Sequence, residues 1–67
     1  MTTRQPMLII YLHNERDRDE VRALVAEQNY VVSGERASEG MVLVREGNLP
    51  RLSEYMTSMG YATELKR

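Results

Sequence analysis

The sequence predicts a small α+β domain with the element order strand, helix, strand, strand, helix, strand. Three observations indicate this order. The segments 7–13 and 41–46 are apolar at both odd and even positions, as expected of central strands that are buried on both faces. Two other segments carry apolar residues at helical spacing, and polar residues or glycines separate all of these elements.

The first helix is predicted over residues 18–28. Asp17 is a suitable N-cap, and Glu20 stands three residues later, where a capping box places its second carboxylate. One helical stripe along this segment is apolar, and it contains Val21, Leu24 and Val25. Asn29 tolerates the left-handed conformation, so we expect the helix to end there.

The second strand is predicted over residues 30–33, which are aromatic or β-branched apart from the last. Residues 34–40 are small, charged and bounded by glycines, which predicts a mobile hairpin loop before the third strand at 41–46. This loop lacks the lysine and the following helix of a phosphate-binding loop, so we expect no ligand there.

The second helix is predicted to begin after Asn48, a suitable N-cap, with Pro50 in its first turn. Its apolar stripe contains Leu49, Leu52, Tyr55, Met56 and Met59. Gly60 should end this helix, and residues 61–65 are then predicted to form the last strand, at an edge of the sheet.

The two halves of the chain resemble each other weakly. Each runs strand, capped helix, a residue suited to the left-handed conformation, and tyrosine. Two such units with right-handed crossovers give the ferredoxin-like βαββαβ architecture, a four-stranded antiparallel sheet with two helices on one face. We expect one domain over residues 1–67, with 1–6 and 66–67 as disordered tails.

The composition restricts the possible functions. A chain of 67 residues buries only about 60% of its unfolded surface, so a deep catalytic pocket would use up most of its core. The absence of cysteine removes disulfides, iron–sulfur clusters and thiolate zinc sites. The longest apolar run, residues 7–12, is too short to span a membrane, and we expect a cytoplasmic protein without membrane contact.

Candidate chemistry is weak. His13, the only histidine, follows the first strand close to Glu15 and Asp17, where it could act as a base or a pH switch. No second histidine, cysteine or nucleophile accompanies it at a defined spacing, and the nearby carboxylates do not match a calcium loop. We therefore expect a non-enzymatic protein with no catalytic, cofactor-binding or metal-binding residues.

Both faces of the predicted sheet are apolar, while helices can cover only one. Strand alternation places the following residues on the helix side: Leu8, Ile10, Leu12, Val31, Val42 and Val44. It places these on the bare side: Ile9, Tyr11, Tyr30, Val32, Leu43, Tyr61 and Thr63. An exposed apolar patch of a few hundred Å² is typical of a binding site. The predicted interaction residues are Ile9, Tyr11, Val32, Leu43, Arg45 and Tyr61.

These observations favour a small protein-interaction or regulatory module that forms a homodimer through its open sheet face, or that inhibits or adapts a larger protein. One alternative is a small-molecule-sensing regulatory domain of the ACT type, although residues 13–17 lack the glycine often found in that loop. A nucleic-acid binder could stack bases on Tyr11, but the third strand has no aromatic residue and the isoelectric point is about 5.8.

Overall fold

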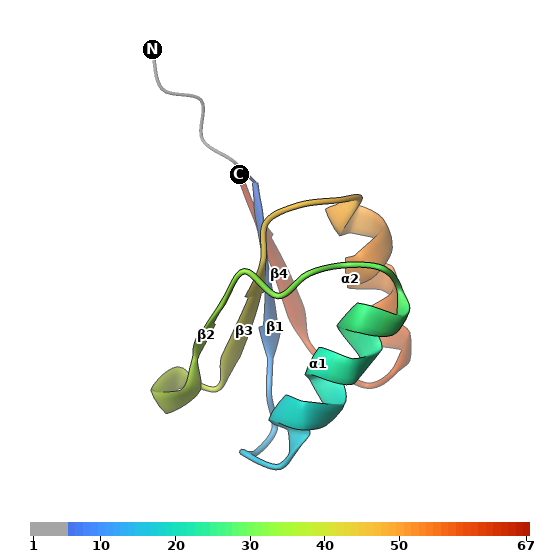
Figure 1. The fold of residues 1–67 in the computed structure, drawn as a ribbon. Coiled ribbons are helices and arrows are strands. Elements are labelled where there is room, and N and C mark those ends of the chain that lie inside the picture. Colours follow the sequence, from blue (N-terminus) through green and yellow to red (C-terminus); the bar gives the residue numbers. More distant parts are fainter. Residues whose placement is uncertain (1–5) are drawn as a thin grey trace.

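Four antiparallel strands form one sheet in the order β2-β3-β1-β4, and two helices cover one of its faces (Figure 1). In the computed structural model, which describes residues 6–67, the elements are β1 (Met7–Tyr11), α1 (Asp17–Glu27), β2 (Gly34–Arg36), a 3₁₀ turn (Ala37–Glu39), β3 (Met41–Val44), α2 (Leu49–Ser58) and β4 (Thr63–Lys66). The predicted α+β class is confirmed, and the strand order is compatible with a ferredoxin-like arrangement.

Both chain ends were expected to be disordered. The expected tail at 1–6 lies, except for Pro6, outside the described residues. At the other end β4 extends through Lys66, which pairs with Met7, so the expectation for residue 66 is wrong. β4 begins and ends later than the sequence predicts, so residue 66 lies within the strand and pairs with β1.

The two helices begin in different ways. In α2, Asn48 is the N-cap as predicted, since its Oδ1 accepts a hydrogen bond from the backbone N–H of Arg51 at 3.2 Å. In α1, Arg16 occupies the cap position without a capping side-chain bond, and Asp17 is already helical. The predicted cap at Asp17 is therefore wrong. Asn14 orders this turn instead, because its Oδ1 accepts from the backbone N–H of Arg16 at 2.9 Å.

Both helices end at the predicted residues. Asn29 has a φ of +66° and Gly60 a φ of +95°, the left-handed conformation expected just after a helix. In each case the tyrosine that follows donates its backbone N–H to the carbonyl five residues earlier. These bonds are Tyr30 to Val25 at 3.1 Å and Tyr61 to Met56 at 3.0 Å. The weak resemblance between the two halves of the sequence therefore reflects a helix ending of the same geometry in each half.

The second strand lies later than predicted. Residues 30–33 are irregular, and β2 occupies Gly34–Arg36, inside the segment predicted as a loop. Hydrogen bonding to β3 begins at Ser33, whose N–H donates to the carbonyl of Leu43 at 2.8 Å. Tyr30 is held elsewhere, because its hydroxyl donates to the carbonyl of Asn48 at 2.8 Å, just before α2. That bond draws the start of the segment away from the sheet.

The core lies between the sheet and the two helices, as expected. Its buried members are Leu8, Ile10, Val21, Leu24, Val25, Val42, Val44, Leu49, Leu52, Met56 and Tyr61, and Leu12 packs against them. Val31 was also predicted on this side, but 71% of its surface is exposed. That prediction is wrong because Val31 lies in the irregular segment before β2, where strand alternation does not apply.

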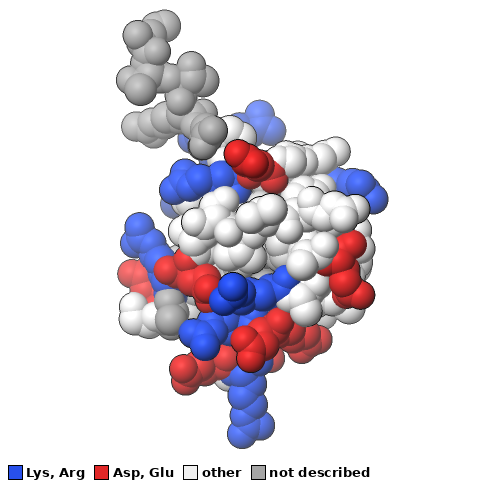
Figure 2. Space-filling view, in the orientation of Figure 1, with Lys and Arg blue, Asp and Glu red and all other residues white. Residues whose placement is uncertain are grey.

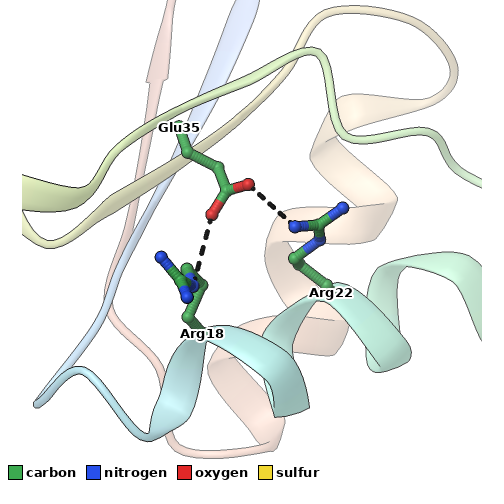
Figure 3. Close-up of polar contacts among 3 residues, drawn as sticks. All are labelled: Arg18, Arg22 and Glu35. Atoms are coloured by element: carbon green, nitrogen blue, oxygen red, sulfur yellow. Dashed lines mark hydrogen bonds and ion pairs between the residues drawn. The ribbon is translucent and has the colours of Figure 1, made fainter.

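An ion-pair cluster ties the edge strand β2 to α1 (Figure 3). Arg22 Nη1 donates to Glu35 Oε2 at 3.0 Å, and Arg18 Nε lies 3.7 Å from the other carboxylate oxygen. Because all three side chains are partly exposed, each ion pair contributes at most about 1 kcal/mol. The cluster therefore positions β2 against the helix more than it stabilises the domain.

Candidate functional site

The sheet face turned away from the helices carries an apolar strip two strands wide. The antiparallel register places Ile9 opposite Leu43 and Tyr11 opposite Met41, and Met7 extends the same row. We call these five residues, Met7, Ile9, Tyr11, Met41 and Leu43, the apolar strip. Ile9 and Leu43 are buried but do not belong to the cluster of buried residues beneath the helices. The two central strands are therefore apolar on both faces, as the sequence predicts.

Charged side chains of both signs border the apolar strip. On the β2 side, Arg36 lies opposite Met41 and pairs with Glu39 at 3.8 Å. On the β4 side, Glu64 lies opposite Ile9 and pairs with Lys66 at 3.7 Å. Four residues of the strip, all but Tyr11, and three of these charged residues, all but Glu64, line a shallow depression of about 250 Å³. The apolar area on this face is therefore narrower than expected, because both edge strands contribute charges.

The centre of the apolar strip is already shielded within one chain. Ile9 and Leu43 keep only 5% and 8% of their surface exposed. The Tyr11 hydroxyl donates to Glu64 at 2.6 Å, which holds this ring beside the charged border. That bond also raises the pKa of Tyr11, because the hydroxyl proton is shared with a carboxylate.

The six predicted interaction residues do not form one surface. Ile9, Tyr11 and Leu43 lie together in the apolar strip, and Arg45 is exposed just after β3. Two others, Val32 and Tyr61, pack against the core between sheet and helices, so their assignment to the bare face is wrong. Their role in binding is not supported by this placement.

The same correction applies to Tyr30 and Thr63. Tyr30 packs against the helix-side core, and the Thr63 hydroxyl lies 2.6 Å from the hydroxyl of Ser53 on α2. The two errors have different causes. Tyr30 lies in the irregular segment before β2, where strand alternation does not apply. Thr63 pairs with the helix-side Ile10, so the alternation of β4 is opposite to the predicted one.

His13 joins two loops. Its Nε2 lies 2.8 Å from the carbonyl oxygen of Gly60, and its ring stacks on Tyr61 with a centroid distance of 5.6 Å. Since a carbonyl oxygen only accepts, Nε2 is the protonated nitrogen in this contact. The sole histidine thus connects the end of β1 to the start of the segment leading into β4.

Tyr61 predicts a loss of stability in alkali. Burial, the neighbouring Glu20 carboxylate and the charge of Asp17 raise the pKa of Tyr61 to about 12, from 10.0. The folded state therefore favours the neutral phenol, so the unfolded chain loses this proton first. We expect the free energy of unfolding to fall between pH 10 and 12, and Tyr61→Phe to reduce that fall. Urea unfolding at several pH values in this window measures it. A Tyr61→Phe profile as steep as the parent's would contradict the assignment.

A hollow of about 430 Å³ lies where β1 leads into α1, lined by Leu12, His13, Asn14, Glu15, Arg18, Ser38 and Gly40. Its place beside the start of a helix would suit an anion, but the backbone N–H groups there already have hydrogen-bond acceptors within the chain. Those of Arg16 and Asp17 bond to Asn14, and that of Arg18 bonds to Glu15. The first turn also carries three carboxylates. Figure 2 shows charges of both signs around this end of the molecule, below a largely uncharged area.

Comparisons with known proteins add no family to this description. No protein-family model matches the chain, and no curated protein or solved structure is significantly similar to it. Within residues 6–67, no group of three or more histidine or acidic side chains is arranged to hold a metal ion. Neither described helix has the length and hydropathy required to cross a membrane.

Proposed function

We propose that this chain is a non-enzymatic interaction module that forms a homodimer through the bare face of its sheet. The observation that supports it best is the apolar strip, because neither helix covers it and three of its residues, Met7, Tyr11 and Met41, remain partly exposed around the buried Ile9 and Leu43. Water is an unfavourable neighbour for such apolar surface. A module of this kind acts by binding, as a regulator or an adaptor, and needs no reactive group.

The charged borders of the strip support a second copy of the chain as the occupant. Each border carries one cation and one anion, Arg36 with Glu39 and Lys66 with Glu64. A twofold axis along the strands places β4 of one copy over β2 of the other. Each border then faces a border of the other copy that also carries one cation and one anion. The exposed ion pairs within each chain can be replaced by ion pairs between the two chains. That exchange costs little, since exposed pairs are worth at most about 1 kcal/mol.

The size of the face sets the strength of such a dimer. Four strands about 4.8 Å apart, which average four residues with a rise of about 3.4 Å each, cover roughly 19 by 14 Å. Stable interfaces bury about 800 Å² on each partner, well above the area of this face. We therefore expect a weak dimer that forms only at high concentration.

Light scattering at high micromolar concentration tests this proposal. We expect at least twice the monomer mass of 7.8 kDa for the parent chain, and half the parent's mass for Tyr11→Glu because the face-to-face contact is lost. The new carboxylate would stand in the apolar strip next to Glu64 and repel its counterpart across the interface. Val31→Glu is the matched control, because Val31 is 71% exposed in a segment outside the strip and should leave the dimer intact. A parent chain that stays monomeric and soluble overturns the proposal.

A further inference from the structure

β4 is an edge strand whose inward hydrogen bonds can be assigned residue by residue. The N–H of Tyr11 donates to the carbonyl of Ala62 at 2.9 Å, which makes these two a hydrogen-bonded pair. Hydrogen-bonded and non-hydrogen-bonded pairs alternate along an antiparallel ladder. The same register therefore directs the backbone groups of Glu64 and Lys66 towards β1.

The alternate residues of β4 present their backbone groups at the edge of the sheet. Thr63 and Leu65 lie opposite β1 residues at non-hydrogen-bonded positions, so their N–H and C=O groups point away from β1. Within residues 6–67, no strand pairs with this outer edge. Such an edge is a template for another strand.

We propose that β4 pairs antiparallel with β4 of a second copy of this chain, in the register centred on Leu65. The outward N–H and C=O groups of the two Leu65 residues then bond to each other across the twofold axis. Glu64 lies directly opposite Lys66 of the partner subunit, and Lys66 opposite the partner's Glu64. These are non-hydrogen-bonded positions, where facing Cα atoms are about 4.5 Å apart and opposite charges stabilise the pairing.

The charges select this register over its neighbours. A ladder centred on Glu64 would place the two Glu64 carboxylates opposite each other, and one centred on Lys66 would oppose the two ammonium groups. A slip by one residue would set the outward groups of Leu65 against Glu64, whose own groups already bond to β1. Only the ladder centred on Leu65 combines hydrogen bonding with opposite charges on both sides of the axis.

The other edge of the sheet does not share this property. Met41 and Leu43 bond towards β2, so Glu35 is the residue of β2 whose backbone groups point outward. A second β2 centred there would oppose two Glu35 carboxylates. Glu35 is also engaged by Arg18 and Arg22 of α1 (Figure 3). Self-pairing is therefore expected at β4 and not at β2.

This edge contact goes beyond the proposed function, because it uses a different surface and leaves the bare face free. Its twofold axis is perpendicular to the sheet, so the two bare faces lie on the same side of one eight-stranded sheet. The apolar strips of the two copies then lie in one continuous surface of about twice the area. A face too small for a stable interface in one copy approaches the usual size in the pair.

The charges on β4 also admit the opposite interpretation. Charged residues on an edge strand, lysine above all, commonly prevent pairing with other chains. In that case Glu64 and Lys66 protect the edge, and the outer groups of Leu65 stay in water. The two interpretations predict different products when cysteines are introduced into this cysteine-free chain.

Disulfide trapping under mild oxidation decides between them. Leu65→Cys should form a covalent dimer, because facing Cα atoms at a hydrogen-bonded pair are about 5.5 Å apart, within the range of a disulfide. Glu64→Cys and Lys66→Cys should each crosslink poorly alone but readily when mixed. Val31→Cys, at an exposed position outside the edge, measures random collision. Two results would overturn the proposal. One is that Leu65→Cys forms its covalent dimer no faster than Val31→Cys does. The other is that Glu64→Cys crosslinks with itself faster than it crosslinks with Lys66→Cys.

Charge reversal provides the second measurement. In the Leu65→Cys background, Lys66→Glu or Glu64→Lys alone should slow crosslinking several-fold, and the double reversal should restore it. Urea unfolding of each variant ensures that only folded proteins are compared. Unchanged rates in the single reversals contradict the register. Met41→Glu, which alters the strip away from β4, should abolish a face-to-face dimer and leave the Leu65→Cys crosslink, so failure of one proposal is distinguishable from failure of the other.

Discussion

Gly47→Ala should destabilise the domain by about 2–5 kcal/mol, the sum of two costs. Gly47 has a φ of +101°, a conformation that costs a residue with a side chain about 1–2 kcal/mol. A Cβ built there would lie 2.7 Å from Cε2 of the Tyr30 ring, closer than real contacts allow, and overpacking of this kind costs about 1–3 kcal/mol. Urea unfolding at pH 7 measures the sum.

Gly60→Ala is the matched control for the backbone cost. Gly60 also has a positive φ, +95°, but a Cβ there would meet no atom within 4 Å. We expect this substitution to cost only the conformational part, so the difference between the two variants isolates the contact with Tyr30. Equal losses at the two glycines would mean that the Tyr30 ring moves aside freely.

A double-mutant cycle with Tyr30→Ser completes the test. Removing the ring costs its packing and its hydroxyl bond to Asn48, but it also opens space above Gly47. Gly47→Ala should therefore cost less in the Tyr30→Ser background than in the parent. The contact matters for the fold, because Tyr30 then fixes the irregular segment before β2 against the start of α2.

The position of Tyr30 also explains why the second strand could not be predicted from the sequence. Nothing between residues 30 and 33 shows that the Tyr30 hydroxyl reaches Asn48, or that hydrogen bonding to β3 begins only at Ser33. Aromatic and β-branched residues predict a strand from local preference, which tertiary contacts override. By contrast, Asn48, Asn29 and Gly60 act within one helical turn, and each occupies the position that the sequence predicts.

The candidate surface was also predicted correctly where local sequence decides the structure, and wrongly where tertiary contacts do. The alternation within β1 and β3 places Ile9 and Leu43 correctly, because both strands are central and begin where expected. The register of β4 on β1 pairs Thr63 with the helix-side Ile10, so the faces of β4 are the reverse of those predicted, and Tyr61 lies in the core. The charged borders were missed for this reason, although the alternation of charged with other residues from Thr63 to Lys66 is a signal for an edge strand with one solvated face.

Leu52→Ala should have an effect on stability as large as that of Gly47→Ala, a loss of about 3 kcal/mol within a range of about 2–5. Leu52 has no exposed surface and lies on the buried side of α2 with Leu49 and Met56. A domain of this length has a total stability of about 3–10 kcal/mol, so the variant should retain little of it. At about 4–8 °C for each kcal/mol, the Tm should fall by roughly 12–24 °C.

Met59→Ala controls for the loss of an apolar side chain at the same helix, because Met59 is 46% exposed at the end of α2. It should change the free energy of unfolding by less than about 0.5 kcal/mol. Comparable losses in the two variants would place the core elsewhere. Association adds a concentration dependence to both measurements, because a dimer of folded chains favours the folded state. If the chain associates through either proposed surface, the Tm of Leu52→Ala should therefore rise with protein concentration. A constant Tm would mean that association with a second copy does not stabilise the folded state.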